Sequence, residues 1–102
     1  MKMSIEERNF NRTLDECRLY FESLKQMHKS KAFSKSNIIT YMTNTYNSLL
    51  EYINNYSKKY NISSDSESVK LAHALANEIK SYLETLTNKQ PKNLYTEQNN
   101  TL

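Results

Sequence analysis

Hydrophobic residues along this chain recur at alternating spacings of four and three residues. The first such row comprises Phe10, Leu14, Cys17, Phe21 and Leu24, with His28 next in register. This spacing places the side chains on one face of an α-helix. Ser4 and Glu7 have the spacing of a capping box, which satisfies backbone N–H groups at a helix start. We therefore predict a helix over residues 4–29.

Two further segments repeat the pattern. The second row comprises Ile39, Met42, Tyr46, Leu49, Ile53, Tyr56 and Tyr60, and the third comprises Val69, Ala72, Ala76, Ile79, Leu83 and Leu86. Ser34 or Ser36 is expected to cap the second helix, and Ser64 with Glu67 forms a second capping-box spacing after a turn at residues 61–65. Pro91 ends any continuation because it lacks the backbone N–H.

These rows predict an all-α fold: an antiparallel up-down-up bundle of three long helices, since short connections make neighbouring helices antiparallel. Residues 8–27, 39–59 and 68–86 are predicted to be helical, with no strand. Residues 1–90 would form the bundle domain, and residues 91–102 a polar C-terminal tail. Phe21, Leu49 and Ile79 lie near the middle of their rows and are predicted to lie in the core.

The hydrophobic surface exceeds what three helices need to pack together. In the second helix Tyr41, Leu50 and Tyr52 lie on more than one side, and in the third Ala72, Ala74 and Ala76 would let another backbone approach closely. Part of this surface would stay exposed in a three-helix monomer. The sequence therefore leaves two alternatives open: the tail folds back as a fourth layer, or a second copy forms a homodimer.

Composition narrows the range of functions. The 102 residues suffice for one domain. The absence of Gly excludes Gly-rich phosphate loops and Asn-Gly hairpins, and a single Cys excludes a disulfide framework or a thiolate metal site. No run approaches 18 apolar residues, and the first residues contain no apolar signal segment. We expect a cytoplasmic protein that does not span a membrane.

The positive charge is concentrated in one stretch. The formal net charge is only +3, but no acidic residue lies between Glu22 and Glu51, and the lysines of that interval are Lys25, Lys29, Lys31 and Lys35. The simplest interpretation is a solvated connection that keeps the protein soluble. The alternative is a docking patch for an acidic protein, a phosphate backbone or an anionic lipid.

No group of residues predicts catalysis, a cofactor or a metal. His73 lies in a segment that weakly resembles the phospho-accepting box of histidine kinases, but Ala74 replaces the acidic residue that would take the proton. His28 is expected to be a helix-end residue and Cys17 a small core residue. Two His far apart in the sequence and a single Cys give no basis for predicting a metal site. We expect a protein that is not an enzyme.

Protein–protein recognition is therefore the predicted function. In size, mild basic charge and bundle layout the chain is similar to immunity proteins of small bacteriocins and to phage-encoded inhibitors, which is a likeness of fold class. It implies a small inhibitor, adaptor or immunity-type protein from a bacterial mobile element. The predicted partner-binding residues are Lys25, Lys29, Lys31, Lys35, Leu94 and Tyr95.

The alternative function is that of a plasmid- or phage-encoded dimer that binds nucleic acid through the Lys25–Lys35 segment. Stacking of bases on tyrosines is not favoured, because most Tyr fall on the predicted core rows.

Overall fold

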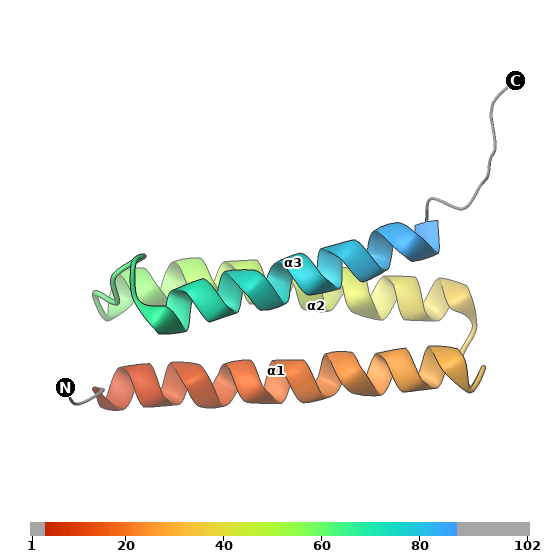
Figure 1. Cartoon of the computed structure of the whole chain (residues 1–102), viewed down its shortest axis with the longest axis horizontal. Helices are drawn as coiled ribbons and strands as arrows, with labels where there is room; N and C mark the ends of the chain where they lie inside the picture. The colour runs from red at the N-terminus through yellow and green to blue at the C-terminus, as the bar shows by residue number, and fades with distance from the viewer. Residues whose placement is uncertain (1–3, 88–102) are drawn as a thin grey trace, which may run out of the picture.

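The computed structural model describes residues 4–87, and these form three helices: α1 (Ile5–Lys29), α2 (Lys35–Lys59) and α3 (Glu67–Thr87). No strand occurs within residues 4–87. The helices run up, down and up, so that the α1–α2 turn and the end of α3 lie at one end of the bundle (Figure 1). The predicted all-α bundle of three antiparallel helices is confirmed, including all three predicted helical ranges. Leu94 and Tyr95 of the predicted tail lie outside the described residues.

Serine side chains begin all three helices. Ser4 Oγ accepts a hydrogen bond from the Glu7 backbone N–H at 3.0 Å, and Ser34 Oγ accepts one from Asn37 at 3.1 Å. The prediction for α3 was wrong by two residues. Ser66 Oγ, not Ser64, accepts from the Val69 N–H at 3.1 Å, and α3 starts directly after it. The physical reason is that Ser64 and Asp65 lie inside a turn closed by a bond from the Ser66 N–H to the Ser63 carbonyl, so the helix begins only after that turn.

Two non-glycine residues take the left-handed conformation that usually suits glycine. Lys31 follows α1 with φ 60°, and Asn61 follows α2 with φ 55°. In this geometry Ala32 N–H donates to the Met27 carbonyl at 3.0 Å and Ile62 N–H donates to the Ser57 carbonyl at 2.8 Å. These bonds satisfy carbonyls that the helix ends leave without partners. The chain, which has no Gly, reverses direction through a lysine and an asparagine instead.

One hydrophobic core runs through the bundle, and all three helices contribute to it. Phe21, Leu49 and Ile79 are 2%, 4% and 0% exposed, as predicted from their positions in the rows. Ala72 and Ala76 of α3 are buried in this core, whereas Ala74 is exposed. Most Tyr are expected in the core, but none of the seven described Tyr is fully buried. Four are half-buried at the edge of the core and three are exposed.

Polar side-chain contacts outside the hydrophobic core also join α1 to α3. Both terminal guanidinium nitrogens of Arg18 on α1 donate to the Glu78 carboxylate on α3, at 3.1 and 2.9 Å. His28 Nδ1 and the Tyr82 hydroxyl lie 3.0 Å apart, which gives the helix-end histidine a partner on α3. The ion pair between Arg18 and Glu78 is largely exposed, and such pairs contribute roughly 0–1 kcal/mol. The core therefore supplies most of the stability.

Candidate interaction surface

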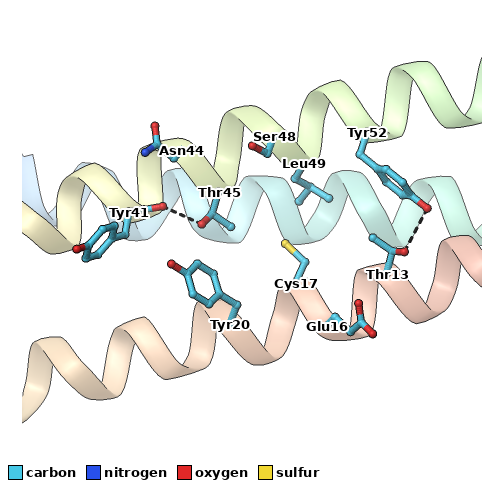
Figure 2. Close-up of a pocket in the computed structure, with 10 residues that line it drawn as sticks. All are labelled: Thr13, Glu16, Cys17, Tyr20, Tyr41, Asn44, Thr45, Ser48, Leu49 and Tyr52. Carbon is cyan, nitrogen blue, oxygen red and sulfur yellow. Dashed lines mark hydrogen bonds between the residues drawn. The ribbon is translucent and has the colours of Figure 1, made fainter.

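A groove lies between α1 and α2 on one side of the bundle. It has a volume of 560 Å³. Its lining residues come from both helices, as Figure 2 shows: Thr13, Glu16, Cys17, Tyr20, Tyr41, Asn44, Thr45, Ser48, Leu49 and Tyr52. Leu49 forms its buried floor, and hydroxyl groups line the α2 side. The groove thus offers an apolar base with polar groups along one wall.

Two internal hydrogen bonds hold residues of the groove in place. The Tyr52 hydroxyl donates to Thr13 Oγ1 at 3.2 Å and joins α2 to α1 at one end of the groove (Figure 2). The Thr45 hydroxyl donates to the Tyr41 carbonyl at 2.8 Å. Phe10 stacks beneath Tyr52, with ring centroids 5.6 Å apart. The walls are therefore fixed by contacts within the bundle.

An aromatic row extends from the groove in both directions along α2. Beyond one end, Phe33 packs edge-on against Tyr41, with centroids 5.8 Å apart. Beyond the other, Tyr52, Tyr56 and Tyr60 pack in sequence at 5.0 and 4.6 Å. A second hollow of 330 Å³ shares Ser48 and Tyr52 with the groove and reaches Lys59. We call this continuous surface the aromatic face; its aromatic members are Tyr20, Phe33, Tyr41, Tyr52, Tyr56 and Tyr60.

The aromatic face contains all the exposed aromatic side chains of the described residues. Seven large hydrophobic residues of the described chain are exposed, and the four aromatic ones among them all belong to this face: Tyr20, Phe33, Tyr41 and Tyr60. Tyr20 is 48% exposed and Tyr41 38%. Single exposed hydrophobic residues are ordinary, whereas a contiguous group of them indicates an interaction site.

Burial shapes the titration of two groups on this face. The half-buried Cys17 thiol points from α1 toward α2 (Figure 2), and burial raises its pKa above the ordinary 9.0, against a smaller opposing effect of Arg18. A raised pKa keeps the thiol protonated and disfavours its use as a nucleophile. Burial also raises the pKa of Tyr56, and the neighbouring Tyr52 and Tyr60 raise it further.

The structure separates one of the predicted lysines from the others. Lys29, Lys31 and Lys35 are exposed on and beside the α1–α2 turn, and we call them the basic loop. Lys25 instead faces α3: its Nζ lies 6.0 Å from the centre of the Tyr82 ring, and it also lies 3.1 Å from a Glu22 oxygen of its own helix. The basic loop lies at the Phe33–Tyr41 end of the aromatic face.

Another hollow, between α1 and α3, is lined by different kinds of residue. It has a volume of 490 Å³ and is lined by charged side chains, among them the paired Arg18 and Glu78, and by the exposed Leu71. Two of its four charged groups, Arg18 and Glu78, already bind each other. It therefore has less free recognition chemistry than the aromatic face.

The described part of the chain contains neither a metal-binding group of side chains nor a membrane-spanning helix. No three His, Cys, Asp or Glu side chains among residues 4–87 come close enough to hold a metal ion together. None of α1, α2 and α3 combines the length and the apolar character that crossing a membrane requires. His73 is exposed on α3.

Comparison of the chain with protein families, with curated proteins and with solved structures found no match. The geometry of the aromatic face is therefore the basis for a functional interpretation.

Sequence reasoning missed Tyr20 and Phe33 as surface residues, although one signal for the face was present. Tyr41 and Tyr52 lie beside the second hydrophobic row, and Tyr20 beside the first. Such flanking positions pack inward only if another element covers them. Which flank α3 covers depends on how the three helices are arranged in space, and helical periodicity does not specify that.

Proposed function

We propose that this protein is a binding module that recognises another protein through the aromatic face and the adjoining basic loop. It would act without catalysis of its own, as a small inhibitor, adaptor or immunity-type protein in the cytoplasm. The observation that carries the proposal is the clustering of four exposed aromatic side chains along one side of the bundle. Tyr is a frequent anchor of protein interfaces, because it supplies contact area with few rotatable bonds and a polar tip.

The basic loop would support recognition in a different way from the aromatic face. Separated surface charges act mainly on the rate of encounter, whereas a desolvated aromatic cluster acts on the lifetime of the complex. Three exposed lysines with no acidic residue in the first turn of α2 produce a local positive field. An acidic partner would be steered to this end of the molecule.

Site-specific crosslinking in cells that naturally carry the gene tests the proposal. A photoreactive benzoylphenylalanine is placed at position 41 in one variant and at position 71 in another. Leu71 is 54% exposed but lies in the α1–α3 hollow, so it is a matched control. We expect a discrete protein adduct from position 41 and none of the same mass from position 71. Equal adducts from both positions, or none from either, would contradict the proposal.

A second candidate function, nucleic-acid binding, is favoured by one observation: the exposed lysines of the basic loop lie at the start of α2. Against it, Glu16 lines the groove and Glu51 lines the adjoining hollow, where they would repel phosphates. Titration with duplex and single-stranded DNA at two salt concentrations separates the two functions. Binding through phosphates weakens steeply with salt, whereas binding through an aromatic face does not.

A further inference from the structure

The aromatic face has the shape of a binding site for one additional helix. From Tyr41 to Lys59 it follows α2 for a length of about 27 Å at 1.5 Å per residue, and α1 forms its opposite wall. Side chains on a helix surface form ridges that fit the groove between two neighbouring helices. An amphipathic helix of about 18 residues would span this length with apolar residues at helical spacing.

The charge of the residues along the aromatic face varies and distinguishes one end of the face from the other. At the loop end, Lys31 and Lys35 are exposed and the first turn of α2 has no acidic residue. Glu16 lines the central groove, and Glu51 lines the next hollow together with Lys59. Only the loop end is therefore basic without opposing carboxylates. An occupant with acidic residues at that end has complementary charge.

The same charges disfavour a second copy of this chain as the occupant. An antiparallel two-fold arrangement centred on the groove would bring two Glu16 carboxylates close together, because Glu16 is the charged residue among those that line it. A parallel arrangement would instead set the two basic loops against each other. Like charges that are brought together in an interface are unfavourable.

We propose that the aromatic face binds one amphipathic helix of a partner protein, with the apolar side of that helix in the groove and its acidic end on Lys31 and Lys35. The inference rests on the proposed function and specifies the partner's chemistry. Tyr20 and Tyr41 would be the central anchors, since they line the groove and are the residues there with the most exposed aromatic area.

Synthetic peptides test this geometry on the full-length protein. The first is an 18-residue helical peptide with apolar residues on one face and Glu in its first turn. The second has Gln in place of those Glu residues, and the third has the composition of the first with the apolar residues scattered. Fluorescence anisotropy at low salt should give the tightest binding for the first and binding weaker by roughly three- to tenfold for the second. The third should not bind.

Protein variants locate the binding. Tyr20→Ala and Tyr41→Ala should each weaken both amphipathic peptides by about tenfold or more, because each removes a central anchor. Leu71→Ala, at an exposed residue outside the face, should leave binding unchanged. The double variant Lys31→Ser/Lys35→Ser should weaken only the acidic peptide. Lys70→Ser/Lys80→Ser removes the same charge from exposed positions of α3 and is the matched control. Circular dichroism confirms that each variant is folded.

Several results would overturn the inference. Equal binding of the scattered peptide would show that no helical face is recognised, and equal losses in the two lysine variants would show nonspecific attraction. A concentration-dependent dimer that Tyr41→Ala abolishes would make a second copy the occupant, and displacement of the peptide by DNA would favour nucleic acid.

If crosslinking at position 41 identifies a partner but the peptides do not bind, the proposed function stands and the helical mode fails. If the peptides bind but no partner is crosslinked, the proposed function fails.

Discussion

Two kinds of hydrophobic residue differ in what they contact. Phe21, Leu49 and Ile79 are enclosed by the other helices, so their burial stabilises the bundle. Tyr20 and Tyr41 present much of their area to solvent beside the groove. The first group sets stability and the second is available for binding. Substitutions in the two groups should therefore have different effects.

Truncation of the core residues tests the first group. Leu49→Ala or Ile79→Ala should lower the free energy of unfolding by about 2–5 kcal/mol, and Phe21→Ala by about 3–5 kcal/mol, because each leaves a cavity. Urea unfolding followed by circular dichroism measures the loss. Leu19→Ala, at a position that is exposed on α1, is the control and should change stability by less than about 0.5 kcal/mol. Losses below roughly 1 kcal/mol at all three core positions would contradict the packing described above.

Cys17 gives a prediction in alkaline solution. Because burial raises the pKa of its thiol above 9.0, the unfolded chain loses this proton first as the pH rises. Between the unfolded and folded pKa values the native state binds more protons, so the free energy of unfolding falls with increasing pH. Urea unfolding from pH 7.5 upward should show a loss in the wild type that begins near pH 9 and is smaller in Cys17→Ala. Parallel curves for the two proteins would contradict the prediction.

At the scale of the helices, the ends are defined by short polar contacts. In each of α1, α2 and α3, a serine hydroxyl accepts a hydrogen bond from a backbone N–H of the first turn. Left-handed residues at Lys31 and Asn61 close α1 and α2. These contacts fix where each helix begins and ends, and so they fix the turn that presents the basic loop.

The two serines near the start of α3 form a matched pair. Ser66→Ala should lower the free energy of unfolding by about 1 kcal/mol, because it removes the acceptor of the Val69 N–H. Ser64→Ala, two residues earlier, should change it by no more than about 0.5 kcal/mol. Thermal unfolding of both variants measures the difference. A larger loss at Ser64 would move the cap back to the position predicted from the sequence.

Lys31 is predicted to make the protein less stable than glycine would at this position, while it adds a positive charge to the basic loop. A non-glycine residue in the left-handed region costs roughly 1 kcal/mol, which Lys31→Gly should regain. The same substitution should weaken binding of the acidic peptide. Lys35 lies in α2, so Lys35→Gly is not a suitable control. Lys31→Asn provides the comparison, because asparagine tolerates the left-handed conformation. An unchanged or lower melting temperature for Lys31→Gly would contradict the prediction.

At the scale of the whole molecule, the up-down-up arrangement brings distant parts of the chain to one end. The end of α3 and the α1–α2 turn lie at the same end of the bundle (Figure 1). The basic loop therefore lies at the same end of the bundle as Thr87, the last residue of α3. The prediction that Leu94 and Tyr95 join that loop in one binding surface follows from this arrangement.

Deletion of residues 92–102 tests that prediction. The hydrophobic core of the described chain is made by residues between Phe10 and Leu86, so the helical signal and the melting temperature should change little. Binding to the partner should weaken, because Leu94 and Tyr95 are removed. Calorimetry and a binding titration on the same samples measure the two effects. Full binding by the shortened protein would confine recognition to the aromatic face and the basic loop.

The sequence alone determined the helices, their order and the centre of the core. Spacings of three and four residues bring side chains to one face through local backbone geometry, so Phe21, Leu49 and Ile79 could be predicted as core residues. The tertiary structure alone decided which flank of each row stays exposed. Tyr20 and Tyr41 flank their rows much as Leu75 flanks the third, yet Leu75 is buried and they are not. Burial of a flanking residue depends on which helix packs beside it, and that choice is made by contacts between residues far apart in the chain.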